Sequence, residues 1–246
     1  MKIDTSYQAK SCSYSSIPRS TSAIKYIVIH YTGNKGDKAA SNAKYFAYTN
    51  TRSAGAHYFV GADGIYRSIK PTRTAWAVGG SKYPNTAGAK MYGKITNKNS
   101  ISVEMCDSVS SVPEVVRLNT TALVCYLMKK YNIPISNVYR HYDVTGKFCP
   151  ASLVGQDSWN KFKSQLKTAY NAGVNLKCSV VGTVKKAGWL YTAAGDRVSR
   201  YSANAIFEVN DTSVKSIRYN NKLYKMYPVN VDGDRYYIKK TNVKLY

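Results

Sequence analysis

Two histidines and one cysteine stand where their side chains could hold a metal ion. His30 ends the apolar run of residues 26–30, and His141 begins a segment that reaches Cys149 eight residues later, with Gly146 between them. A strand end and the loop that follows a second strand can bring such residues together. Zinc accepts imidazole nitrogen and thiolate sulfur, and catalytic zinc sites use three protein ligands and leave the fourth position to water. On the residues alone, hydrogen-bonded core or surface histidines remain the commoner explanation.

Strands and helices alternate along the part of the chain that must position these residues. Runs of strand length cover 26–30, 57–60, 65–69, 100–106 and 138–141, and the second and third of these read as a hairpin around 61–64. Helical patterns cover 37–50, where Asp37 suits a helix start, 113–131 and 157–172. Residues 79–99 are rich in Gly, Ser, Asn, Lys and Thr and predict a long loop, which in a compact domain is usually functional or mobile. This order of elements predicts an α/β domain.

The last 70 residues have a different character. From about residue 178 helical periodicity disappears, and short runs rich in Tyr, Val and Ile are divided by turn signals such as 194–196, 220–221 and 232–234. Several short strands with tight turns predict a small β-barrel. A chain of 246 residues has room for two domains, because domains commonly run to about 100–150 residues.

The net charge of +23, from 36 Lys and Arg against 13 Asp and Glu, predicts a polyanionic partner. Nucleic acid, an anionic membrane and a bacterial wall all qualify, and a solvated basic face is an equally good explanation. No apolar stretch approaches the roughly 18 residues that span a membrane. The first residues contain no apolar segment of the kind that directs export, so we expect synthesis in the cytoplasm without a signal peptide. Five widely spaced cysteines argue against a disulfide framework.

Four motifs, in order, resemble the type-2 family of N-acetylmuramoyl-L-alanine amidases, which includes phage endolysins and is related to peptidoglycan recognition proteins. They are Tyr26-Ile-Val-Ile-His30-Tyr-Thr-Gly33, Ser53-Ala-Gly-Ala-His57-Tyr-Phe-Val60, Asn99-Ser-Ile-Ser-Val-Glu104 and Arg140-His141-Tyr-Asp-Val-Thr-Gly-Lys147-Phe-Cys149-Pro150. The resemblance covers roughly residues 20–170. It implies a central mixed β-sheet flanked by helices, and a zinc enzyme that hydrolyses the amide bond between N-acetylmuramic acid and the L-alanine of peptidoglycan.

The resemblance also implies roles for single residues. His30, His141 and Cys149 match the zinc ligands, Glu104 matches a general base beside the metal, and Lys147 matches a position thought to stabilise the oxyanion. The alternatives are an outward-facing carboxylate for Glu104 and a solvated turn for Lys147. Some members place a tyrosine before the equivalent of His57, where this chain has Ala56, so a tyrosine-assisted mechanism is not expected.

Two further residues are candidates for substrate binding. His57 resembles a residue near the cleft, although a hydrogen-bonded core histidine explains it as well. Trp76 resembles a residue of the segment that lines the groove, and its aromatic face would pack on a sugar or a peptide, although tryptophan is more often simply core.

The physical chemistry of an amide hydrolase agrees with these implied roles. An amide is a poor electrophile, and Zn²⁺ both polarises a carbonyl and lowers the pKa of bound water to about 7. Burying Glu104 in an otherwise apolar strand costs free energy unless it has a polar partner. A position beside a cation would provide that partner.

The predicted organisation is a zinc amidase domain at 1–172, a linker at 173–177 and a wall-binding domain at 178–246. The tail from Arg235 to Tyr246 resembles the closing strands of bacterial SH3-like modules. We expect an endolysin that contacts peptidoglycan and anionic wall polymers, acts on the wall after release, and has no nucleic-acid partner. The alternatives are a peptidoglycan-binding protein without activity, against which the presence of Cys149 argues, and a nucleic-acid-binding protein, which only the charge favours.

Overall fold

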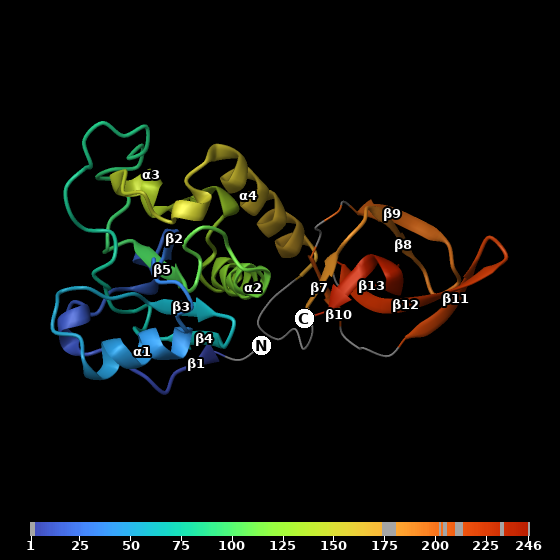
Figure 1. The fold of residues 1–246 in the computed structure, drawn as a ribbon, viewed down its shortest axis with the longest axis horizontal. Helices are drawn as coiled ribbons and strands as arrows, with labels where there is room; N and C mark the ends of the chain where they lie inside the picture. The colour runs from blue at the N-terminus through green and yellow to red at the C-terminus, as the bar shows by residue number, and fades with distance from the viewer. Residues whose placement is uncertain are drawn as a thin grey trace. The chain divides into compact units, whose positions relative to one another are not determined.

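The computed structural model describes residues 3–173, 181–201, 203, 206–209, 214–231 and 234–245 (Figure 1). The chain divides into two compact units, residues 2–162 and residues 163–246. The dividing point falls inside helix α4 (Gln156–Asn171). All but the first residue of the predicted linker, and Cys178 after it, lie outside the described residues. No helix in the described part of the chain combines the length and the apolar character needed to cross a membrane.

A six-stranded sheet forms the centre of the first unit. Its strands run in the order β1 (Ile3–Asp4), β4 (Gly64–Arg67), β3 (Tyr58–Gly61), β5 (Ser100–Met105), β2 (Tyr26–Tyr31) and β6 (Val138–Arg140). Strands β3 and β4 form an antiparallel hairpin, and the other neighbouring pairs are parallel. The central strands β2 and β5 are buried along nearly their whole length, as expected for parallel strands that are covered on both faces. The predicted mixed sheet is therefore confirmed.

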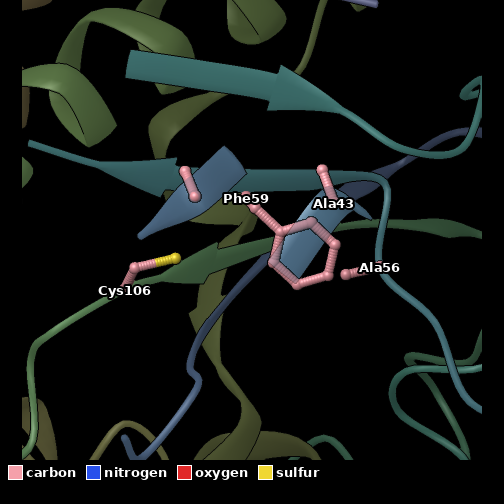
Figure 2. Close-up of a cluster of buried hydrophobic side chains, with 5 residues drawn as sticks. Ala43, Ala56, Phe59 and Cys106 are labelled. Carbon is pink, nitrogen blue, oxygen red and sulfur yellow. The ribbon is translucent and has the colours of Figure 1, made fainter. Parts of the chain in front are cut away.

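Helices pack on both faces of this sheet. Helix α1 (Ala39–Tyr48) contributes Ala39 and Ala43 to a buried cluster with Phe59 of β3, and Figure 2 shows Phe59, Ala43, Ala56 and Cys106 gathered there. On the opposite face Tyr58 is buried, and its pKa is raised by that burial and by Tyr131 of α2 (Glu114–Tyr131). Alternating residues of one strand thus contact different helices, because successive side chains point to opposite faces.

Two helix starts differ from the sequence-based prediction. Helix α1 begins at Ala39, and Asp37 does not cap it. The Asp63 carboxylate, in the turn of the β3–β4 hairpin, instead accepts the backbone N–H groups of Ala39 and Ala40 at 3.0 and 2.9 Å. The sequence pattern places His141 at a strand end, but it is the first residue of the short helix α3 (His141–Thr145).

The second unit contains a separate, wholly antiparallel sheet. Its strands are β7 (Val181–Val184), β8 (Gly188–Tyr191), β9 (Arg197–Tyr201), β10 (Ile206–Val209), β11 (Lys215–Tyr219), β12 (Lys222–Val231), β13 (Asp234–Lys239) and β14 (Val243–Leu245). One core cluster of this unit contains Tyr191, Ile217, Met226 and Tyr237. The short strands expected here are present, while the SH3-like barrel stays a prediction.

Candidate metal centre and groove

The polar side chains of the site come from residues that pair with one another across neighbouring strands of the sheet. His30 of β2 pairs in register with Glu104 of β5, and Glu104 pairs with Phe59 of β3. Residues paired in this way project from the same face of a sheet. His30 and Glu104 therefore emerge on the face that carries helix α1, and the His30 Nδ1 atom lies 3.9 Å from a Glu104 carboxylate oxygen.

His30, His141 and Cys149 meet at this point. One potential ligand atom from each lies within 4.8 Å of the others, and all three residues are buried. The Cys149 sulfur is 3.9 Å from His30 Nδ1, and the two imidazole rings are 4.6 Å apart between centroids. Sulfur and nitrogen bound to one tetrahedral zinc would be about 3.6 Å apart, given the usual bond lengths. The donor set and its spacing therefore fit a zinc ion.

Unsatisfied polar atoms point to the same conclusion. His141 Nδ1 and one Glu104 oxygen are buried and have no hydrogen-bond partner among the described residues. Such atoms are costly to bury. A cation held between these side chains would remove part of that cost.

Burial keeps both imidazoles in the form that binds metal. Desolvation, reinforced for His30 by the charge of His141, holds the pKa of His30 well below its ordinary value. Desolvation and Lys147 lower the pKa of His141 to about 4. Both rings are therefore neutral at pH 7. Burial raises the pKa of the Cys149 thiol to about 12, so its thiolate needs a cation beside it, and a coordinating thiol is deprotonated by the metal.

Arg140 anchors the segment that carries two of the three ligands. Its guanidinium is buried, forms two hydrogen bonds with the Asp143 carboxylate at 3.0 and 2.6 Å, and donates to the carbonyls of Leu153 and Val154 at 3.0 and 2.8 Å. The backbone N–H of Tyr142 also donates to the Cys149 carbonyl at 2.8 Å. These bonds tie the start and the end of the segment together. The sequence-based prediction missed Arg140, although an Arg and an Asp three residues apart beside a candidate ligand were a signal for it.

Glu104 and Lys147 lie on the groove at the metal centre. The Glu104 side chain is 19% exposed. Desolvation raises the pKa of its carboxyl to about 7, and Lys147 opposes this shift. Lys147 itself is exposed, and its backbone carbonyl accepts the N–H of Cys149 at 2.7 Å.

The groove has a volume of about 670 Å³ and a mixed lining. Besides the three ligands, Glu104 and Lys147, its walls include Asp37, Arg52 and the 37% exposed ring of Trp76. Trp76 also lines a second hollow of about 430 Å³, whose other walls include Val78, Tyr92 and Val144.

His57 does not reach this groove. It is 1% exposed, its Nδ1 accepts the backbone N–H of Ser102 at 3.0 Å, and its Nε2 lies 3.0 Å from the Arg73 carbonyl oxygen. The Arg19 guanidinium lies 3.1 Å from Nε2. Burial and this charge lower the pKa of His57 to about 3. The geometry is that of the hydrogen-bonded core histidine.

A comparison with protein families identifies the first unit. Residues 20–152 match the model of the N-acetylmuramoyl-L-alanine amidase family. The chain belongs to this family. The match spans all three candidate ligands, Glu104 and Lys147.

Curated amidases of Bacillus are similar over most of this chain. It is 29% identical to XlyB of Bacillus subtilis over 209 residues, which is 84% of this chain and 59% of XlyB. It is 30% identical to CwlL of Bacillus licheniformis over 235 residues, which is 85% of this chain and 63% of CwlL. The chain thus spans about three fifths of the length of these amidases.

Solved structures support the fold. PlyL is 29% identical, with a TM-score of 0.55 over 68% of this chain and 97% of the PlyL chain. The catalytic domain of PlyG is 27% identical, with a TM-score of 0.54 over 69% of this chain and 96% of that domain. These similarities agree with the mixed sheet and helices of the first unit.

Proposed function

We propose that this protein is a zinc-dependent N-acetylmuramoyl-L-alanine amidase that hydrolyses the amide bond between N-acetylmuramic acid and L-alanine in peptidoglycan. One observation carries the proposal: two neutral imidazoles and one thiol meet within 4.8 Å at a groove, in a chain of the amidase family. His30, His141 and Cys149 would hold the ion. When bound, zinc supplies Lewis-acid polarisation of a carbonyl and makes water more acidic.

Glu104 is the proposed general base. Its carboxylate leaves the same sheet face as His30 and has one oxygen without a partner among the described residues. A carboxylate in this position can take a proton from a water molecule in the groove and deliver it to the leaving amine. Position 56 holds Ala56 and offers no tyrosine hydroxyl, which leaves the base role to Glu104.

Lys147 and Trp76 are proposed to act on the substrate. The Lys147 ammonium is close enough to lower the pKa of both Glu104 and His141, so it would also stabilise negative charge that develops on the scissile carbonyl oxygen. The exposed Trp76 ring would hold the substrate in the groove through its aromatic face. His57, which lies outside the groove lining, has no part in this proposal.

The second unit is proposed to bind the bacterial cell wall, and the whole chain to act as a lytic enzyme on that wall. The position of the candidate site supports this division, because every proposed ligand and the base precede residue 150. We retain the boundaries 1–172, 173–177 and 178–246 as proposed limits of the catalytic domain, linker and SH3-like wall-binding domain. A peptidoglycan-binding protein without activity is the alternative, and the intact ligand set argues against it.

Released end groups test the activity directly. Purified protein is incubated with peptidoglycan, and the products are assigned by mass spectrometry. New N-terminal L-alanine is expected. New reducing sugar ends would indicate a glycosidase, and no release would indicate binding alone; either result would overturn the proposal.

Metal content tests the ligand set. The wild-type chain is expected to hold about one zinc, and Cys149→Ser to lose both zinc and activity, because serine does not replace the thiolate. Cys12→Ser, at a cysteine outside the site, is the matched control and should keep both. A Cys149→Ser protein with normal zinc and activity would refute the assignment.

A further inference from the structure

Basic and aromatic side chains alternate on one face of the sheet in the second unit. Arg197 lies 5.1 Å from the ring centroid of Trp189 and 4.7 Å from that of Tyr219. Arg200 lies 5.7 Å from the same ring centroid of Trp189. Lys239 lies 5.8 Å from the Tyr219 centroid and 3.5 Å from that of Tyr224. We call these six residues, Trp189, Arg197, Arg200, Tyr219, Tyr224 and Lys239, the cation–aromatic ladder.

Strand pairing explains why the ladder is continuous. Its members come from five strands, β8, β9, β11, β12 and β13, which are labelled in Figure 1. In one register row Lys215 of β11 and Lys239 of β13 flank Met226 of β12. Neighbouring strands lie about 4.8 Å apart, so the backbones of the two lysines are about 10 Å apart on one face. The core residue Met226 is buried between them, while Lys215 is exposed and Lys239 is partly exposed.

The cations of the ladder are held in place without being neutralised. In the described part of the chain no carboxylate forms an ion pair with Arg197, Arg200 or Lys239. The nearest acidic residue in sequence, Asp196, accepts a hydrogen bond from the Thr192 hydroxyl. A cation over an aromatic face is attracted by the ring and keeps its charge. The rings also restrict the side chains, which lowers the entropy cost of binding an anion.

We propose that the cation–aromatic ladder binds a phosphodiester-linked polyanion of the bacterial cell wall. Several fixed positive charges in a row fit a polymer with regularly spaced phosphates better than they fit a single small anion. The choice of a wall polymer rests on the proposed function of the first unit. The alternative polyanion, nucleic acid, is disfavoured because bases bind to single-strand sites largely by stacking on aromatic faces. Here Arg197 and Lys239 already lie over the rings of Trp189, Tyr219 and Tyr224.

The test measures binding of the full-length chain to soluble poly(glycerol phosphate), and to purified Gram-positive walls before and after chemical removal of their phosphodiester polymers. Arg197→Gln/Arg200→Gln removes two charges of the ladder and is expected to lower affinity at least about tenfold. It should also reduce the slope of log affinity against log salt by about one for each phosphate that the variant no longer binds. Lys185→Gln/Lys186→Gln removes two exposed charges of the same unit outside the ladder and should change affinity less than about twofold.

Further measurements distinguish a loss of ladder binding from misfolding and from a failure of the proposed function. Arg197→Lys/Arg200→Lys keeps the charges and should recover most of the binding, which excludes simple misfolding. All variants should hydrolyse soluble muropeptides at the wild-type rate. If neither the wild type nor any variant hydrolyses them while polymer binding changes as expected, the proposed function is wrong and the inferred polymer binding by the ladder is still supported. Equal losses of affinity in the two Gln pairs, equal binding to stripped walls, or tighter binding to DNA than to poly(glycerol phosphate) would overturn the inference.

Discussion

The three candidate ligands are positioned by different kinds of structure. His30 belongs to the central strand β2, which pairs in parallel with β5 and β6, and His30 itself pairs with Glu104. His141 starts a short helix held by Arg140, and Cys149 is fixed through its backbone to Tyr142 and Lys147. Little rearrangement is therefore needed to bind a metal, and hydrogen bonds that orient metal ligands commonly change metal affinity 10- to 100-fold.

The base role of Glu104 can be separated from metal binding. Glu104→Gln preserves the shape of the side chain and removes the proton acceptor, so zinc content should stay near one per chain while turnover falls at least about a hundredfold. Glu114→Gln, at an acidic residue of α2 that pairs with Arg117 at 3.8 Å, is the matched control and should retain full activity. Near-normal turnover of Glu104→Gln on soluble muropeptides would move the base role to another group.

His57 predicts how stability changes with acid. Its pKa is about 3 in the folded chain and about 6.5 in an unfolded one. Between these values the unfolded state binds a proton that the folded state does not, so stability falls as the pH drops from about 6.5 toward 3, by up to about 1.4 kcal/mol per pH unit. In His57→Gln the slope of unfolding free energy against pH should be smaller by about one proton, measured by urea unfolding between pH 6.5 and 4.5. The contributions of His30 and His141 are common to both proteins, and identical slopes would contradict the prediction.

At the scale of elements, the sequence pattern did not predict helix α3. Residues 138–141 have strand character, but the Asp143 carboxylate accepts the backbone N–H of Arg140 at 2.8 Å and starts a helix at His141. The Arg140 guanidinium also lies over the rings of Tyr142 and Trp159. One side chain thus links the last strand of the sheet, the ligand helix and α4.

Arg140→Lys tests this positioning role. Lysine keeps the charge but has no planar fork to reach Asp143 and two carbonyls together. The variant should bind zinc at least about tenfold more weakly, in a competition assay with a metal indicator, and should unfold at lower temperature. Arg117→Lys, at a partly buried arginine of α2 that pairs with Glu114, is the control. Unchanged zinc affinity would reduce Arg140 to a residue of general stability.

Local signals predict the elements better than their ends. The apolar runs of β2 and β5, the hairpin of β3 and β4, and the helix after Pro113 follow from periodicity and turn residues, and the structure contains all of them. The predicted cap of α1 is wrong, because Asp63, distant in sequence, supplies the carboxylate that the pattern assigns to Asp37. The role of Arg140 was not predicted for the same reason, because the carbonyls of Leu153 and Val154 that accept its hydrogen bonds come near it only when the loop folds.

At the scale of the whole molecule, positive charge is spread over both parts of the chain. Residues 1–170 contain 23 basic and 8 acidic residues, and residues 171–246 contain 13 and 5. Net charge alone therefore gives either part an attraction to a polyanion. The second unit arranges three of its cations in one ladder over neighbouring strands, whereas the first unit contains the candidate catalytic groups.

Truncation separates these contributions. A chain ending at Gly173 should hydrolyse soluble muropeptides at close to the full-length rate, because all proposed catalytic residues precede residue 150. It should lyse intact cells much more slowly, because a tethered binding unit raises the effective concentration of enzyme at an insoluble substrate. Turbidity loss of cell suspensions and product release from soluble muropeptides measure the two effects. Equal lysis by the two chains would remove the binding role of the second unit.

A metal ion held by these ligands would also stabilise the fold, because the ligands are far apart in the sequence. His30 and Cys149 are 119 residues apart, so an ion bound to both closes a long loop much as a disulfide does. At a thousand times its dissociation constant, a ligand specific for the folded state adds about 4 kcal/mol of stability, which for a unit of this size is a rise on the order of 10 °C in melting temperature. Calorimetry with and without a chelator should show this shift in the transition of the first unit and none in that of the second. A metal-starved enzyme would then be lost to unfolding and proteolysis, so zinc supply would set its lifetime as well as its rate.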